Sequence, residues 1–237
     1  MGRGVRIPKL SSLFRRKPKS RLRRILDGAA LVLVGIFASL SFAPELLAWP
    51  YRAERGPITI YSEAPITADV DRVLAKSERL LSASPLHRPD LRRRLFLSQG
   101  GWRWTLLALQ TRGAFAFRRP FNNALIFNRS DVSADRITNG RTLGGVRSLS
   151  GVIAHETTHV LVARKLGELQ AMMLPTWKQE GYADHVARES SLTREQYRMI
   201  SRGGNGHPAA DYFEARLRVE EALAANGANV DALLAGP

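Results

Sequence analysis

The chain has no cysteine and only five histidines among its 237 residues. Without cysteine it forms neither disulfide bonds nor thiolate metal sites, so a metal site in this protein has to use nitrogen and oxygen ligands. Internal repeats are absent, and no low-complexity stretch occurs beyond a basic N-terminal tail. The length suits one globular domain with additional segments.

Acidic residues are few relative to basic ones, since 21 Asp and Glu against 36 Lys and Arg give a formal net charge of +15. Ten of the cations lie in residues 1–24, which contain no acid, and subtracting 10 from 15 leaves +5 for the rest of the chain. That remainder is ordinary for a domain of this size. The cations precede an apolar segment instead of alternating with aromatic residues on a folded face, so we expect no nucleic-acid partner.

No charged residue occurs in the apolar run from Gly28 to Pro44, and apolar neighbours extend it in both directions. This pattern predicts one membrane-spanning helix, with Trp49 and Tyr51 as aromatic residues at the far interface. The cationic tail then remains in the cytoplasm, and the part of the chain after the membrane helix lies on the other side of the membrane. The expected organisation is a basic cytoplasmic tail at 1–24, a transmembrane signal-anchor at 25–49, a linker at 50–56 and a folded domain at 57–237.

A cleaved signal peptide is the alternative interpretation of the N-terminal region, because a basic start followed by an apolar run describes both. Ser41 and Ala43 are small residues with the spacing of a cleavage site. Pro44 directly after that site disfavours cleavage there, and a cut after Ala48 would have the bulky Leu46 upstream. The anchor is therefore preferred, and secretion after cleavage remains the alternative.

His155 and His159 lie four residues apart in the sequence HETTH, a spacing that places both imidazoles on one face of a helix. Apolar residues flank the motif on both sides, and Glu156 is the only charge between Arg147 and Arg164. We therefore expect a buried helix at about 148–166. Two such histidines either bind one metal ion, most often zinc, or simply form hydrogen bonds in a core.

A catalytic zinc ion needs a third protein ligand and an open position for water. The segment WKQEGYAD at 177–184 offers two carboxylates, Glu180 and Asp184, again on one helical face. We predict Glu180 as the third ligand. Asp184 and the adjacent His185 remain rivals for that role.

The two segments together resemble the gluzincin group of zinc metallopeptidases, which have peptidase MA-like domains and the pattern HExxH followed by WxxEGxA. The resemblance implies that His155, His159 and Glu180 bind Zn²⁺. It also implies that Glu156 is the catalytic base and that Asp184 orients His155.

The likeness covers residues 145–190 and, more loosely, residues 212–234. One departure is His185, which stands where many relatives carry an aromatic residue. The expected fold class is α+β, a helix-rich zincin-like domain with a small mixed sheet after one transmembrane helix. We expect strands at 57–61, 94–98, 114–117 and 123–128, and helices after Thr67, at 148–166, after Pro175, from Thr193 and at 209–225.

The strand at 124–127 is expected either to border the active-site cleft with an open edge or to lie buried within the sheet. Tyr212 and His207 are candidates for the catalytic donor that stabilises an oxyanion, and residues 203–206 read as a turn or a mobile flap.

The resemblance implies a zinc-dependent peptidase that hydrolyses peptide bonds, and the predicted N-terminal helix makes it membrane-anchored with extracytoplasmic protein substrates. The alternative is a catalytically inactive zinc-binding scaffold domain of the cell envelope, which the intact Glu156 disfavours. The sequence does not predict cleavage specificity or oligomeric state.

Overall fold

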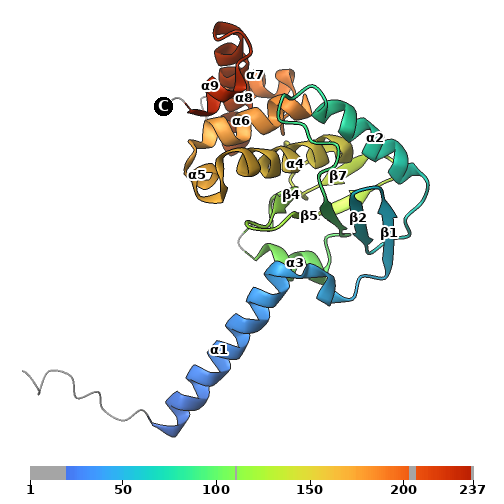
Figure 1. The fold of residues 1–237 in the computed structure, drawn as a ribbon, viewed down its shortest axis with the longest axis vertical. Coiled ribbons are helices and arrows are strands. Elements are labelled where there is room, and N and C mark those ends of the chain that lie inside the picture. Colours follow the sequence, from blue (N-terminus) through green and yellow to red (C-terminus); the bar gives the residue numbers. More distant parts are fainter. Residues whose placement is uncertain (1–19, 110, 203–206, 236–237) are drawn as a thin grey trace, which may run out of the picture. The chain divides into compact units, whose positions relative to one another are not determined.

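The computed structural model describes residues 20–109, 111–202 and 207–235, so most of the basic tail and the segment 203–206 lie outside the described residues. The chain divides into two compact units, Met1–Ser39 and Leu40–Pro237 (Figure 1). The second unit contains the sheets and all helices after the first one.

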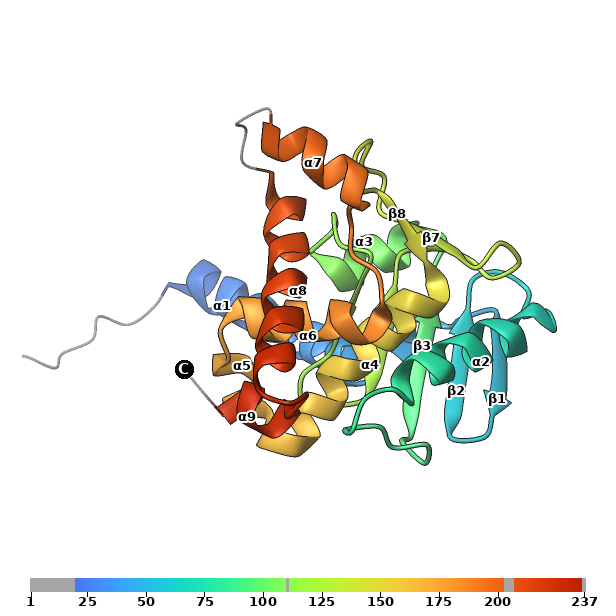
Figure 2. The ribbon, with the colours of Figure 1, turned by 90° about the horizontal axis from the view of Figure 1, so that it is seen from above.

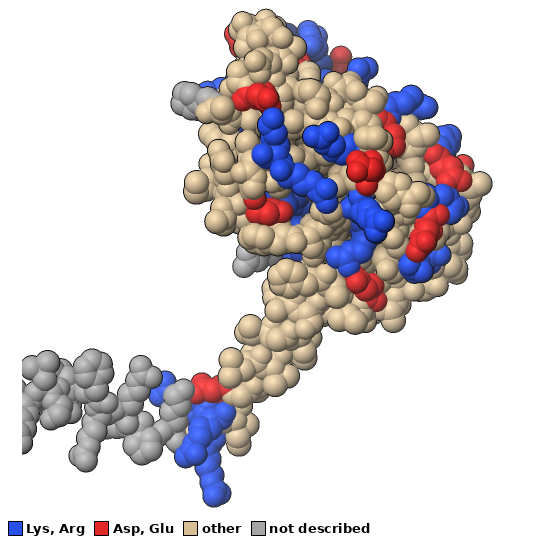
Figure 3. Space-filling view, viewed as in Figure 1, with Lys and Arg blue, Asp and Glu red and all other residues tan. Residues whose placement is uncertain are grey.

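Helix α1 (Arg21–Phe42) has no buried residue, although its sequence is largely apolar. Its charged side chains gather at its N-terminal end, and the rest of its surface is uncharged (Figure 3). Among the described residues it is the one helix long and apolar enough to cross a membrane, a test that a signal sequence also passes. One N-terminal apolar helix is therefore present.

The apolar helix ends earlier than the predicted boundary at residue 49. Pro44 lacks a backbone N–H and cannot continue an α-helix, so the chain turns into the short 3₁₀ helix η2 (Pro44–Leu47). Pro44 and Leu47 are buried in the second unit, and the indole N–H of Trp49 donates to the Pro44 carbonyl at 2.9 Å. The last residues of the expected span thus belong to the globular unit.

The predicted linker at 50–56 is instead a strand, β1 (Tyr51–Arg55), that pairs antiparallel with β2 (Ile58–Ser62). The prediction of a linker was wrong because β1 lies at the sheet edge and is mostly exposed, so it needs no alternating apolar side chains. Charged residues are common on such edge strands.

The main sheet contains five strands in the order β1-β2-β3-β5-β4. β2 pairs parallel with β3 (Arg93–Leu97), β3 pairs parallel with β5 (Ala124–Phe127), and β5 pairs antiparallel with β4 (Ala116–Arg118). The prediction of an α+β fold with a small mixed sheet is confirmed. β5 lies inside the sheet, and the two edge strands are β1 and β4.

Helices cover both faces of this sheet. Alternate residues of β3 and β5, such as Leu95 and Phe127, pack in one core with α2 (Asp69–Leu81) and α4 (Leu149–Leu166). Phe96 and Ile126 point the other way and pack with α3 (Trp102–Ala108) in a second core. This alternation explains why every residue of β5 is buried.

A second, three-stranded antiparallel sheet was not expected from the sequence. It consists of β6 (Arg129–Asp131), β7 (Arg136–Thr138) and β8 (Val146–Ser148), and β8 leads directly into α4. Ser148 is the N-cap of α4, and its hydroxyl accepts from Gly151 N at 3.0 Å. The small sheet therefore fixes the start of the HExxH helix.

Helix α6 (Thr176–Ala187) packs between α4 and α8 (Pro208–Ala225), and Figure 2 shows the three helices side by side. Gly181 permits the close approach to α8, because a Cβ there would collide with the carbonyl oxygen of Ala215. Three shorter helices complete the layer: α5 (Glu168–Met173), α7 (Arg194–Arg202) and α9 (Val230–Ala235).

Candidate metal centre

Helix α4 turns His155 and His159 toward the same point. Their Nε2 atoms lie 3.1 Å apart, and the two rings are nearly perpendicular at 83°. His155 is buried and His159 is partly buried, because α4 lies between the main sheet and α6. The spacing of one helical turn produces this arrangement directly.

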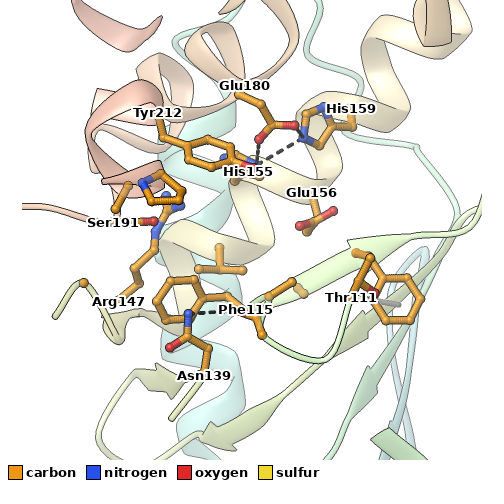
Figure 4. Close-up of a pocket in the computed structure, with 18 of the residues that line it drawn as sticks. Thr111, Phe115, Asn139, Arg147, His155, Glu156, His159, Glu180, Ser191 and Tyr212 are labelled. Atoms are coloured by element: carbon orange, nitrogen blue, oxygen red, sulfur yellow. Dashed lines mark hydrogen bonds and ion pairs between the residues drawn. The ribbon is translucent and has the colours of Figure 1, made fainter. Parts of the chain in front are cut away.

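Helix α6 brings Glu180 to the two histidines. Its Oε2 lies 3.3 Å from His155 Nε2 and its Oε1 lies 3.6 Å from His159 Nε2. One ligand atom from each of the three residues lies within 4.8 Å of the other two (Figure 4). Two imidazole nitrogens and one carboxylate, converging from two packed helices, can hold one metal ion.

Asp184 lies one turn after Glu180 on α6 and fixes the ring of His155. Its Oδ1 is 2.8 Å from His155 Nδ1, which leaves Nε2 facing the cluster. The same Oδ1 accepts a hydrogen bond from Arg147 Nη2 at 2.9 Å. Both Asp184 and Arg147 are buried, where an unpaired charge would be costly. Their ion pair compensates the positive charge of Arg147 and the negative charge of Asp184.

Arg147 and Glu189 extend this chain of charges to the start of α4. Arg147 Nε donates to Glu189 Oε1 at 3.2 Å, and Glu189 Oε2 accepts from the Ser148 hydroxyl at 3.0 Å. Neither residue was predicted as part of the site. The sequence near Arg147 gives no signal of this role, because its partner Asp184 lies 37 residues further along the chain, on α6.

Glu156 follows His155 on α4 and is buried, yet it lies beside the three-residue cluster without entering it (Figure 4). Its side chain lines the same pocket, which has a volume of about 550 Å³. Burial raises the pKa of Glu156 to about 7. A carboxyl group with such a pKa can accept and release a proton near neutrality.

The surroundings of the two histidines give them different proton affinities. Burial lowers the pKa of His159 to about 4. Burial also disfavours charge on His155, but hydrogen bonds to Asp184 and Glu180 outweigh it and raise the pKa to about 10. The two carboxylates therefore make the cluster favourable for positive charge, whether a proton or a metal cation carries it.

Strand β4 runs along the pocket with its edge open. Arg119 N donates to Ala124 O and Asn128 N donates to Phe115 O, so these alternate residues face β5. In an antiparallel ladder the backbone groups of the intervening Ala116 and Arg118 then face away from β5. Residues 113–118 line the pocket, which places a free strand edge beside the cluster.

The remaining predicted site residues have different positions. Tyr212, on α8, lines the same pocket as the three-residue cluster (Figure 4). His207 is not among the residues lining the pocket, and its Nδ1 instead accepts from Ala209 N at 3.1 Å as the N-cap of α8. His185 Nδ1 lies 3.8 Å from Glu220 Oε1, and His185 is not part of the three-residue cluster.

Comparisons of the chain with protein-family models, curated proteins and solved structures find no match, so the chemistry of this centre has to be inferred from its own side chains.

Proposed function

We propose that this protein is a membrane-anchored, zinc-dependent peptidase of the gluzincin type. The observation that carries the proposal is the cluster of His155, His159 and Glu180 beside the buried Glu156. A purely structural cluster has no chemical need for a buried carboxylate next to its ligands. That argument also disfavours the alternative of an inactive scaffold.

The donor set fits zinc. Two imidazoles and one carboxylate are a common ligand set of catalytic zinc sites, which keep a fourth position for water or substrate. The pocket beside the cluster provides room for that position. Asp184 fits the requirement that the ring nitrogen away from the metal has its own hydrogen-bond partner. When bound, zinc would polarise the scissile carbonyl and lower the pKa of water.

The protein's own residues then have separate tasks. Glu156 accepts a proton from the attacking water and passes it to the leaving amine. Asp184, itself held by Arg147, keeps His155 in the orientation that the cluster requires. Tyr212 lines the same pocket, and its hydroxyl would donate to the oxygen on which negative charge develops. His207 has no task in this mechanism, because its ring is the N-cap of α8.

The open edge of β4 supports a peptide as the substrate. An extended peptide can form backbone hydrogen bonds with Ala116 and Arg118 and thereby lie along the pocket. Arg118 is itself held by Glu168, whose two oxygens accept from it at 3.1 and 2.8 Å. Small ester or amide substrates would make no use of such an edge.

The location follows from α1. We propose that it spans a membrane with the basic tail on the cytoplasmic side and the globular unit outside. The packing of residues 40–49 favours the anchor over a cleaved signal. Arg94 and Asn122 donate to the Phe42 carbonyl, and a cut after Ala48 would remove the buried Leu47 from its core.

The decisive experiment combines metal analysis with a protease assay on the full-length chain in detergent. We expect wild type and Glu156→Gln each to bind about one zinc ion, and only wild type to cleave a fluorescently labelled, unfolded protein. Glu221→Gln, the same change on the exposed side of α8, is the matched control and should retain activity. Equal cleavage by Glu156→Gln would remove Glu156 from the mechanism, and a wild type without bound metal would refute the metal centre.

A further inference from the structure

Three arginines line the pocket around the cluster, and they differ in their partners. Arg118 binds both oxygens of Glu168, and Arg147 binds Asp184 and Glu189. Within the described part of the chain, the guanidinium of Arg141 has no carboxylate partner. The pocket's two acidic residues, Glu156 and Glu180, belong to the candidate metal centre.

The loop between β7 and β8 holds Arg141 in a defined place. The backbone N–H of Arg141 donates to Asn139 Oδ1 at 3.0 Å, and Asn139 Nδ2 in turn donates to the Gly113 carbonyl at 3.1 Å. A Cβ at Gly145 would collide with the Arg141 carbonyl oxygen, so the turn depends on that glycine. The loop is thus fastened to the segment that leads into β4.

The guanidinium lies over a second glycine. A Cβ at Gly113 would be only 3.0 Å from Arg141 Nη2 and 3.4 Å from Nε. The missing side chain at Gly113 therefore leaves room for the planar group at the pocket wall. Arg141 remains exposed to solvent there, and Tyr212 lines the same pocket.

We propose that Arg141 forms a carboxylate-binding subsite that selects peptides with a negative charge close to the scissile bond. The carboxylate is either an acidic side chain or the free C-terminal group of the peptide, since both present the same pair of oxygens. An arginine fork binds such a pair with two parallel hydrogen bonds. This inference rests on the proposed peptidase function and adds its substrate preference.

The other charges of the pocket sharpen the selection. A substrate carboxylate is attracted by Arg141, whereas Arg118 and Arg147 are already neutralised by their partners. A substrate lysine near Arg141 is repelled by the guanidinium. We expect the preference for acidic over basic peptides to be on the order of tenfold in kcat/KM, the contribution of one charge-assisted hydrogen bond.

The test uses the full-length protein and peptides of one sequence. The first set has blocked ends and carries Glu, Gln or Lys at each position flanking the cleaved bond. The second set carries Gln and ends in either a free carboxylate or an amide. Wild type is compared with Arg141→Glu, Arg141→Lys and the control Arg88→Glu, which makes the same charge change at an exposed loop outside this pocket.

We expect wild type to prefer Glu at one position or the free C-terminus, and these two outcomes distinguish the side-chain source from the terminal source. Arg141→Glu should shift the preference toward Lys or the amide, Arg141→Lys should keep part of the wild-type preference, and Arg88→Glu should keep all of it. An Arg141→Glu enzyme that cleaves with the wild-type preference overturns the subsite and leaves the peptidase function intact. A wild type that cleaves no peptide in either set overturns the peptidase function itself.

Discussion

Helices α1 and α4 have similar apolar sequences and opposite surroundings. None of the 22 residues of α1 is buried, whereas 14 of the 18 residues of α4 are. An apolar segment by itself therefore predicts only that water has to be excluded from it. Whether protein or lipid does so depends on the polar residues that the segment carries and on their partners.

Three of the polar residues of α4, Ser150, His155 and Thr158, have hydrogen-bond partners within the domain. Thr158 Oγ1 donates to Ala154 O at 2.8 Å, the Ser150 hydroxyl donates to Asp135 at 2.8 Å, and His155 binds Asp184. In α1 the hydroxyl of Ser39 bonds within the helix, to Gly35 O at 2.9 Å. α4 is therefore built to place polar groups inside a core, and α1 to present apolar side chains to its surroundings.

We expect the largest difference between the helices when a buried or exposed valine is replaced by lysine, because the effect on folding should differ between α4 and α1. Val152 is 1% exposed, and Val152→Lys puts an unpaired charge into the core at a cost of several kcal/mol, comparable with the whole stability of a domain. Val34 is 64% exposed, so Val34→Lys should leave the folded domain intact in detergent. In cells it should reduce membrane insertion, because lysine at the centre of a span costs about 2.5–3.5 kcal/mol.

Circular dichroism in detergent and membrane fractionation measure these two outcomes. Loss of the folded domain in Val34→Lys would contradict the comparison, as would normal folding of Val152→Lys. A Val34→Lys protein that remains fully membrane-bound would count against α1 as a span.

A second pair compares glycines. A Cβ at Gly181 on α6 would collide with the backbone of α8, whereas a Cβ at Gly35 on α1 meets nothing within 4 Å. We expect Gly181→Ala to lower the free energy of unfolding by about 1–2 kcal/mol, since overpacking exceeds the gain in helix propensity. Gly35→Ala should not change it. Urea unfolding of both variants measures the effect, and a stabilised Gly181→Ala protein would show that α6 and α8 can separate without loss.

Local spacing explains how much of the site was predictable. His155 and His159 share a helix, as do Glu180 and Asp184, so the relative directions within each pair follow from helical geometry alone. That the two pairs meet depends on α6 packing against α4, which the sequence indicated through the need for a third zinc ligand and through the gluzincin resemblance. Arg147 was missed because its role exists only once Asp184 lies beside it.

The fold shows the same difference between features that a local sequence pattern predicts and features that depend on contacts between distant segments. β2, β3 and β5 each contain buried apolar residues, and their positions were predicted to within a few residues. β6, β7 and β8 have three residues each, too few to show an alternating pattern. β1 was missed because it is held by backbone hydrogen bonds to β2, and its exposed, charged side chains do not show the alternation of apolar and polar residues that predicts a strand. Short strands and edge strands thus escape pattern analysis for physical reasons.

The smallest expected effect concerns the starts of the two helices. Asp135 Oδ1 accepts from Ser150 N at 2.7 Å, and its Oδ2 accepts from the Ser150 hydroxyl and from Lys76 Nζ, both at 2.8 Å. These bonds satisfy backbone and side-chain donors at the N-terminus of α4, and the negative charge is favourable at that end. Asp135 has a φ of 48°, a conformation that asparagine also tolerates, so Asp135→Asn removes the charge without straining the backbone.

We expect Asp135→Asn to lower the free energy of unfolding by about 1 kcal/mol, because the side chain is only 9% exposed and its carboxylate bonds are lost. The matched change at α1 is Ser20→Ala, where the hydroxyl accepts from Arg23 N at 3.3 Å on an exposed surface. It should leave the unfolding of the globular unit unchanged, since α1 has no buried residue. Equal shifts of the urea midpoint in the two variants would mean that the start of α1 supports the folded unit as the start of α4 does, and the contrast between the helices would then be lost.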